Sequence, residues 1–207
     1  MNRGMPMPLF EFENFDLSCD DSISRSFRAQ GIQTFYEAID YVHQCEYRRA
    51  DDRSNYRAVV QTGYGTCSTK HALLAELATT YNVPLQLLCG IVLLDEATMP
   101  SLKELLTQLE VDVFPEAHCF LQGPSIRLDL TFKDQPIYPT YVVIESIPLS
   151  PDQIGSYKIN WHRAYLQLWM QNVGLNQRYT LENIWLKREH WIQYLSALNA
   201  EPKLIDP

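Results

Sequence analysis

The stretch GTCSTKHALLAELATTYNVPLQLLCG, residues 65–90, contains the strongest structural signals in the chain. Gly65 stands two residues before Cys67, and apolar residues recur at helical spacing after this cysteine. The Asn-Val-Pro triplet at 82–84 predicts the end of this helix, because the residue before a proline disfavours the helical conformation. The apolar run at 85–94 predicts a buried strand. A helix that begins at Cys67 is therefore followed directly by a strand.

Outward from this stretch, the chain predicts helices on both sides and further strands downstream. Residues up to 28 lack periodicity and are expected to form an irregular arm. A capping-box pattern at Ser101 and Glu104 predicts a short amphipathic helix. The remaining expected elements are a helix at 31–48, an extended piece at 56–62, strands at 117–122, 126–132 and 141–147, and helices at 161–173 and 181–198. The expected order is helices, then a meander of strands, then helices again. This order indicates an α+β fold rather than a repeated βαβ unit.

Cys67 is a candidate nucleophile because of its place in the helix. The first turn of a helix has unpaired amide N–H groups and the positive end of the helix dipole. Both stabilise a thiolate and lower the pKa of a thiol. A cysteine at a helix start is also compatible with a plain core residue, so this signal needs partners.

The candidate partners are His118 and Asp129. A two-residue turn at Gly123-Pro124 would place Gln122 opposite Ser125, and the same register would place His118 opposite Asp129. Directly opposed residues have Cβ atoms ~5 Å apart, within reach of a carboxylate–imidazole hydrogen bond. A carboxylate on one ring nitrogen leaves the other nitrogen for a thiol. An incidental cross-strand polar pair is the alternative interpretation.

These residues resemble the transglutaminase-like superfamily, over about residues 61–132. Members of that superfamily begin a helix with a cysteine, end it at a stop similar to Gly-Ile-Pro, and continue into a strand that ends in glycine. A strand histidine and an aspartate after a short hairpin complete the pattern. The matching positions here are, in order, Cys67, the triplet at 82–84, Gly90, His118 and Asp129. The chain resembles a small, bacterial-type member.

The resemblance implies a papain-like, transglutaminase-type core with an antiparallel sheet packed on the nucleophile helix. It also implies a cysteine-dependent acyl-transfer enzyme that acts on peptide or protein amides through a thioester, with a catalytic triad of Cys67, His118 and Asp129. Water as the acyl acceptor would make the protein a peptidase or amidase, and an amine acceptor would make it a transglutaminase. A non-catalytic binding module that retains the fold is the third interpretation. Signatures of papain and caspases are absent from the sequence.

Several other residues suggest additional or competing roles. Gln61, by analogy with a glutamine upstream of the nucleophile in papain-like enzymes, is a candidate oxyanion donor. His71, one helical turn after Cys67, is an alternative base, although a histidine on a helix surface is more often solvated. A zinc site built from Cys67, His71, His118 and Cys119 is disfavoured, because close ligand pairs of the usual spacing are missing. The four tryptophans are expected to pack in the core. No cofactor is expected.

Composition sets limits on the remaining classes of function. The 207 residues contain 17 basic and 25 acidic side chains, a formal net charge of -8, which disfavours nucleic-acid and anionic-membrane binding. No apolar run has the ~20 residues of a membrane-spanning helix. Five cysteines, an odd number, favour a reducing compartment, so a cytoplasmic location is expected. We expect one domain over 1–207, with a core at about 56–147, an N-terminal helical arm at 1–55 and a C-terminal helical extension at 156–207; the sequence leaves the oligomeric state open.

Overall fold

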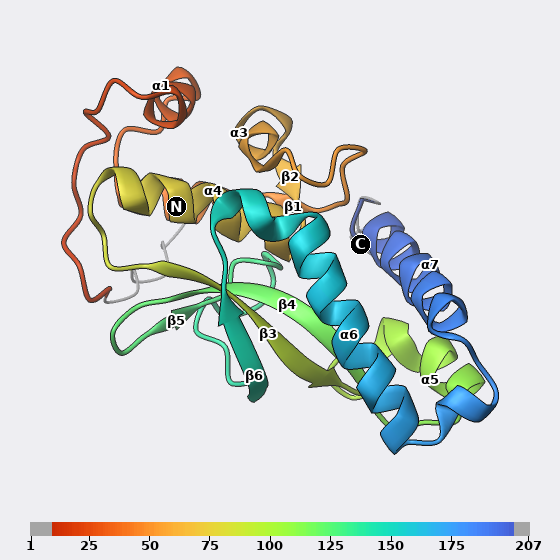
Figure 1. The fold of residues 1–207 in the computed structure, drawn as a ribbon. Coiled ribbons are helices and arrows are strands. Elements are labelled where there is room, and N and C mark those ends of the chain that lie inside the picture. Colours follow the sequence, from red (N-terminus) through yellow and green to blue (C-terminus); the bar gives the residue numbers. More distant parts are fainter. Residues whose placement is uncertain (1–9, 201–207) are drawn as a thin grey trace.

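The computed structural model describes residues 10–200, which form seven α-helices and a four-stranded antiparallel sheet (Figure 1). The helices are α1 (Ser22–Ala29), α2 (Phe35–Gln44), α3 (Val59–Thr62), α4 (Cys67–Thr80), α5 (Lys103–Leu109), α6 (Ser156–Asn172) and α7 (Leu181–Ala200). The strands are β1 (Glu46–Tyr47), β2 (Tyr64–Gly65), β3 (Gln86–Leu94), β4 (Phe114–Gln122), β5 (Arg127–Leu128) and β6 (Val143–Pro148). The short strands β1 and β2 pair in parallel, and the other four form the sheet.

The sheet is built around β3 and β4, which pair antiparallel along their whole length. Its strand order is β5-β4-β3-β6, so β6 lies beside β3 rather than extending a simple meander. Gly90 explains how β6 approaches so closely, because a Cβ at this position would lie 2.5 Å from Cγ1 of Val143. The pairing of β3 with β6 shifts register between Gly90 and Val92. The strand expected at 85–94 is confirmed.

Helix α4 is the central helix of the fold. It ends at Thr80, just before Asn82 adopts a left-handed backbone conformation with φ 55°, so the helix stop predicted from the Asn-Val-Pro triplet is confirmed. Ten of its side chains are buried, including the polar Lys70 and His71. The helix packs against β3 and β4 on one side and against α2 on another. The nucleophile candidate therefore begins a helix that is enclosed by the protein core.

Two hydrophobic clusters divide the interior. One joins α1, α2 and α4 to the sheet, and the other joins α5, α6 and α7 to the end of β4. Figure 1 shows α1, α3 and α4 on one side of the sheet, α6 running alongside β4, and α5 and α7 on the far side of α6. Trp169, Trp185 and Trp191 are buried in the second cluster, and Trp161 packs against the first, so the expected core packing of the tryptophans is confirmed.

Several expected local structures were wrong. The segment expected to be an irregular arm contains α1, which is capped by the Asp21 carboxylate accepting from the N–H groups of Ile23 and Ser24. The piece expected to be extended at 56–62 is a 3-10 turn followed by α3. The capping box at 101–104 does not form, because a 3-10 turn from Pro100 leads directly into α5. The helix expected at 31–48 is confirmed only as the shorter α2, which a Thr34–Glu37 capping box starts.

The hairpin register also differs from the expected one. The loop has four residues, since the N–H of Gly123 donates to the carbonyl of Ile126 at 2.8 Å, and Gln122 pairs with Arg127. The shift of two residues preserves the side-chain alternation, because strand residues two apart share a face. His118 and Asp129 therefore stay on one face, as diagonal rather than opposed neighbours. Asp129 lies one residue beyond the end of β5.

The α+β class and the antiparallel sheet packed on the Cys67 helix are confirmed. The papain-like core is not shown: the described residues form an open four-stranded sheet with one edge strand of only two residues. The C-terminal helices expected at 161–173 and 181–198 form as α6 and α7.

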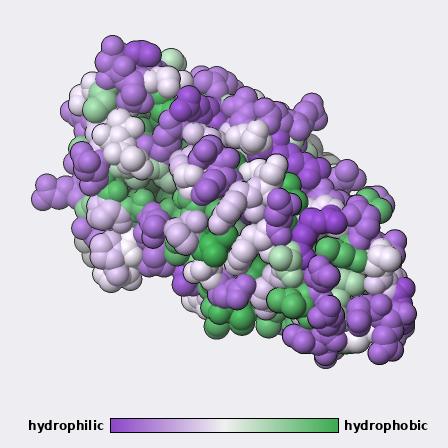
Figure 2. Space-filling view, viewed as in Figure 1, coloured by the Kyte–Doolittle hydropathy of each residue, from purple (hydrophilic) through white to green (hydrophobic). Residues whose placement is uncertain are grey.

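Hydrophilic side chains cover most of the face seen in Figure 2, and apolar ones gather in its lower half. Among residues 10–200, no helix combines the length and the apolar character needed to cross a membrane.

Candidate active site

Cys67 is the first residue of α4 and is partly exposed. Thr66 precedes it in an extended conformation, and the Thr66 N–H donates to Oγ1 of Thr69 at 2.9 Å, which fixes the first turn. Gly65 permits this close turn, because a Cβ there would lie 2.7 Å from the same Oγ1 atom. The expected helix start at Cys67 is confirmed.

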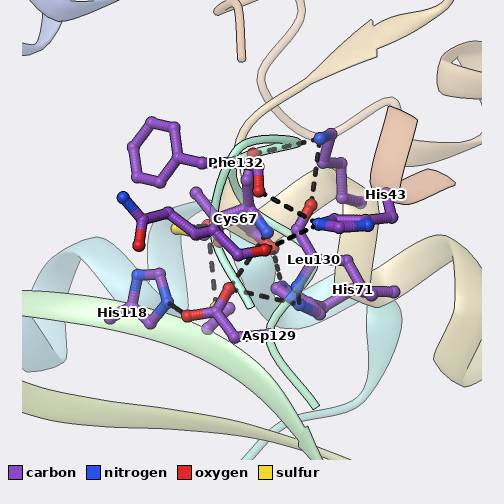
Figure 3. A network of polar contacts seen from close by, with 12 residues as sticks. His43, Cys67, His71, His118, Asp129, Leu130 and Phe132 are labelled. Atoms are coloured by element: carbon purple, nitrogen blue, oxygen red, sulfur yellow. Dashed lines mark hydrogen bonds and ion pairs between the residues drawn. The ribbon is translucent and has the colours of Figure 1, made fainter. Parts of the chain in front are cut away.

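His118 on β4 donates from Nε2 to Oδ2 of Asp129 at 2.7 Å, so the expected hydrogen bond is confirmed (Figure 3). Since Nε2 is committed to the carboxylate, Nδ1 is the ring nitrogen left for Cys67. Cys67 and His118 line the same cleft, and the charges of Asp129 and Cys67 raise the pKa of His118 against its burial. The three side chains thus follow one another in the order sulfur, imidazole, carboxylate.

Asp129 is held by donors on both carboxylate oxygens. Oδ2 also accepts from the Tyr141 hydroxyl at 2.9 Å, and Oδ1 accepts from the Thr131 N–H at 3.0 Å. Burial would raise the pKa of Asp129, but the charge of His118 and these hydrogen bonds hold it well below its usual value. The carboxylate is therefore ionised and fixed in orientation.

His118 is a strong candidate for a protonated partner of the thiol. Burial alone would lower the pKa of His118, but the charges and hydrogen bonds of Asp129 and Cys67 raise it well above 6.5. An imidazolium placed between a carboxylate and a thiol is the arrangement that stabilises a thiolate in cysteine nucleophiles.

His71 is not the base. Its Nδ1 donates to the Cys67 carbonyl at 2.7 Å, and its Nε2 accepts from the Leu130 N–H at 2.8 Å (Figure 3). Burial lowers the pKa of His71 to about 4, so the ring is neutral and its 3.7 Å approach to Asp129 is not an ion pair. The role of His71 is to join the start of α4 to the loop that carries Asp129.

Lys70, which no sequence pattern singled out, supports the same loop. Its buried ammonium group donates to the carbonyls of Cys45, Leu130 and Thr131 at 2.6, 3.0 and 3.0 Å. Burial lowers the pKa of Lys70 to about 8. His43 holds the next part of the loop from Nε2, 3.1 Å from the carbonyls of Phe132 and Gln135. Asp129 is thus positioned from helix α4 as well as from the sheet.

Lys158 of α6 is a second buried cation beside the nucleophile. Its Nζ donates to Oγ of Ser68 at 2.8 Å, and the same hydroxyl lies 3.9 Å from the Cys67 sulfur and 3.6 Å from that of Cys119. Burial alone would lower the pKa of Lys158, but the neighbouring thiols Cys119, Cys67 and Cys89 raise it. No spacing pattern links residue 158 to residue 67, so the sequence did not predict this neighbour.

The pKa of the Cys67 thiol lies well below its usual value. A hydrogen bond with the Cys119 thiol makes the largest contribution, burial opposes it, and the charges of Lys158 and His118 lower the pKa further. All five cysteines are free thiols. Cys67 is thus a thiolate candidate enclosed by two cationic side chains.

Gln61 does not belong to this site. It lies on α3 with an exposed side chain, and its Nε2 points to Oγ of Ser26 at 3.5 Å. The prediction placed it in an extended segment leading to Cys67, whereas the helical turn at 59–62 directs its side chain elsewhere. Within residues 10–200, no group of three or more His, Cys, Asp or Glu side chains is arranged to hold a metal ion.

Cys67 lines two cavities. The small cavity, about 80 Å³, is bounded by the start of α4 and by α6 and α7, with Lys158, His162 and Arg188 among its lining residues. The large cleft, about 630 Å³, is lined by Cys67, His118 and Asp129 together with the ends of β3 and β4, residues 131–141 and α7. The candidate nucleophile therefore lies where a ligand in the large cleft meets a cation-lined cavity.

Comparisons with protein-family models, with curated proteins and with solved structures gave no match.

Proposed function

We propose that this protein is a cysteine-dependent acyl-transfer enzyme acting on amide bonds of peptides or proteins, a peptidase or amidase of the transglutaminase-like type. The observation that carries the proposal is His118, which bonds to Asp129 at 2.7 Å and has its other nitrogen free for Cys67 at the start of α4. A buried ionised carboxylate, an imidazole and a thiol in this order form the minimal apparatus of nucleophilic acyl transfer.

In the proposed reaction, the Cys67 thiolate attacks the amide carbonyl carbon. His118 then gives its proton to the departing amine as the C–N bond breaks, which leaves a thioester on Cys67. A water molecule, deprotonated by His118, attacks the thioester and releases the carboxylic acid and the free thiolate. Asp129 orients the ring and stabilises its cation throughout, without taking the proton.

The tetrahedral intermediate places negative charge on the former carbonyl oxygen. The backbone N–H of Cys67 at the helix start is one donor for it. Lys158 lines the small cavity beside Cys67 and supplies a positive charge there. In this proposal Lys158, in place of Gln61, helps to stabilise the oxyanion. The Cys67 N–H and the Lys158 ammonium group are thus the two groups proposed to stabilise the oxyanion.

The acyl acceptor distinguishes a hydrolase from a transglutaminase, and water is the simpler assignment. The five free thiols suit a reducing, cytoplasmic setting. A non-catalytic module with the same fold would retain the hydrogen bonds but form no thioester.

Acylation by para-nitrophenyl acetate tests the proposal directly. We expect a burst of one nitrophenolate per chain and a hydroxylamine-sensitive acetyl group on Cys67. The variants Cys67→Ala and His118→Gln should show no burst, while Cys19→Ala, which removes a cysteine outside the site, should behave as the wild type. When propylamine is added, the ratio of released acetate to N-propylacetamide shows whether water or the amine is the preferred acyl acceptor. Absence of a burst in the folded wild type would reject the enzyme and favour the binding module.

A further inference from the structure

The large cleft is much bigger than an amide group requires. Its volume of about 630 Å³ lies within the range of pockets that enclose drug-sized ligands, roughly 300–1,000 Å³. Cys67, His118 and Asp129 occupy one part of its wall, so most of the cleft is available to whatever is attached to the reacting amide.

Among residues 10–200, those that line the cleft leave no charge uncompensated. Of its lining residues, only Glu116, His118 and Asp129 have side chains that ordinarily carry charge near neutral pH. Glu116 is paired with Arg188, which donates to both carboxylate oxygens, and Asp129 is paired with His118. A charged group on a ligand would therefore lose its hydration without gaining a partner.

Most of the rest of the wall is aliphatic or aromatic, and its remaining polar side chains, among them Thr98, Gln135 and Thr140, are neutral. The end of β3 and helix α7 provide one side, and the segment after Asp129 provides the other. These apolar lining residues are Val92, Leu93, Leu94, Met99, Phe132, Pro136, Pro139, Tyr141, Trp191, Ile192 and Leu195. Leu93 is 41% exposed, which leaves apolar surface at the cleft in contact with solvent.

One polar group next to the triad has no partner among the described residues. The hydroxyl of Thr131 is buried and makes no hydrogen bond of ordinary geometry; it helps to lower the pKa of Asp129, and its residue lines the cleft two positions after that carboxylate. A buried unpaired hydroxyl is costly, and an amide group of a ligand is a suitable partner for it.

We infer that the large cleft binds an uncharged, apolar group attached to the reacting amide, a long aliphatic or aromatic chain rather than an acidic or basic one. This inference rests on the proposed function, because it assumes that the ligand presents its amide to Cys67. Apolar contact supplies the affinity, the unpaired Thr131 hydroxyl meets the amide, and the absence of free charge excludes ionic substrates.

Three iodoacetamides of equal chain length test this inference. They carry on the amide nitrogen a hexyl chain, a hexanoic acid and a hexyl-trimethylammonium group. The measured quantity is the second-order rate of Cys67 alkylation in the full chain, normalised to the same rates with glutathione. Each fully buried methylene is worth a factor of roughly four, so we expect the hexyl probe to react about tenfold or more faster than either charged probe.

A charge placed at the cleft should change this order. Leu93→Glu adds a carboxylate at an already exposed position of the wall. The trimethylammonium probe should therefore alkylate Cys67 faster than in the wild type, and the hexyl probe should alkylate it more slowly. Leu186→Glu is the matched control, because Leu186 is 49% exposed on α7 and does not line the cleft. The control should keep the wild-type order of the three rates.

The outcomes separate the two proposals. Selective alkylation of Cys67 with equal normalised rates for the three probes would overturn the apolar cleft and leave the nucleophile assignment intact. Failure of all three probes to prefer Cys67 over the other four cysteines would overturn the proposed function, and this inference with it.

Discussion

At the scale of single residues, Cys67 and His118 shift each other's proton affinity in opposite directions. The pKa of the Cys67 thiol is lowered by the Cys119 hydrogen bond and by the charges of Lys158 and His118, and the pKa of His118 is raised against its burial by Asp129 and Cys67. These opposite shifts favour a thiolate–imidazolium pair over the neutral thiol and imidazole. The thiol should remain reactive at pH values well below the ordinary thiol pKa of about 8.5.

Replacing Asp129 with asparagine removes the anion and keeps the shape. The imidazolium then loses its ionic partner, so turnover of an ester or amide substrate should fall by roughly three to four orders of magnitude. Circular dichroism should show an intact fold. Unchanged turnover would reassign Asp129 to a purely structural role in the loop after β5.

Replacing Lys158 with methionine separates the effect of this cation from that of His118. Without the buried charge, the pKa of the Cys67 thiol should rise, so the pH profile of alkylation should shift to higher pH. Lys158→Arg should shift it much less, because the positive charge is retained. The methionine variant should also melt at a lower temperature, because it removes one member of a buried charged group, so the pH profile is measured on protein that circular dichroism shows to be folded. Identical pH profiles for the methionine variant and the wild type would remove Lys158 from the site.

Cys67→Ala should abolish acylation at little cost in stability. Cys67 is partly exposed at a helix start, where alanine is well tolerated, and it lines two cavities rather than filling one. A buried structural cysteine would instead leave a void and lower the free energy of unfolding by about 1 kcal/mol or more. Thermal melts measured beside the acylation assay distinguish the two cases.

At the scale of secondary-structure elements, the start of α4 depends on a glycine that leaves no room for a side chain. A Cβ on Gly65 would lie 2.7 Å from Oγ1 of Thr69 and 2.9 Å from Cγ2 of Val59. Gly65→Ala should therefore displace the first turn, lower the free energy of unfolding by roughly 1–3 kcal/mol and slow alkylation of Cys67. Chemical denaturation and labelling check both effects. A variant as stable and as reactive as the wild type would show that the first turn does not need this close contact.

Local sequence signals were sufficient for α4 and β3, because a helix stop and a long apolar run are encoded within a few residues. The hairpin was harder, since Gly123-Pro124 suggests a two-residue turn and the actual loop has four residues. His118 and Asp129 were still predicted as partners because a shift of two residues keeps both on one face. The strand predicted at 126–132 ends at Leu128, where Asp129 turns to meet His118 and Tyr141.

The parts of the site that sequence did not reveal come from distant segments. Lys158 lies 90 residues beyond Ser68, and Lys70 reaches carbonyls 60 and 61 residues downstream. Neither of these long-range contacts leaves a pattern in the neighbouring sequence that could predict it. Gln61 was chosen by analogy with its distance from the nucleophile, and a helical turn in place of an extended segment removed it from the site.

At the scale of the whole molecule, the C-terminal helices are part of the site. Helix α6 carries Lys158, and α7 carries Arg188, which pairs with Glu116 of β4 in the wall between the two cavities. Within the segment expected to be an extension at 156–207, the described helices α6 and α7 thus line the candidate site as well as adding to the core.

Arg188→Met should destabilise the protein by about 3–5 kcal/mol, because it leaves Glu116 buried and unpaired. Adding Glu116→Gln should restore much of the loss. Arg163→Met is the control, since its ion pair with Glu182 joins α6 to α7 at the surface and should matter far less. Urea titrations of the four proteins measure these differences, and equal losses for Arg188→Met and Arg163→Met would contradict the account.

The same pair predicts a dependence on pH. Burial would raise the pKa of Glu116, but Arg188 and its other cationic neighbours hold it below 4.5. A depressed carboxyl pKa contributes stability above the unfolded value and loses it as the pH falls through the folded value. Between about pH 6 and about pH 3, the wild type should lose more stability than the Glu116→Gln, Arg188→Met double variant. Parallel losses would mean that Glu116 does not gain stability from Arg188.

The most direct test of the central claim is brief iodoacetamide labelling at mildly acidic pH, with the modified cysteines identified by mass spectrometry. The lowered pKa of Cys67 favours its thiolate form beside His118 and Lys158, while Cys45, Cys89 and Cys119 are buried. The account predicts that Cys67 is alkylated selectively and that His118→Gln abolishes this selectivity. Equal labelling of the accessible cysteines, or no labelling of Cys67, would contradict it.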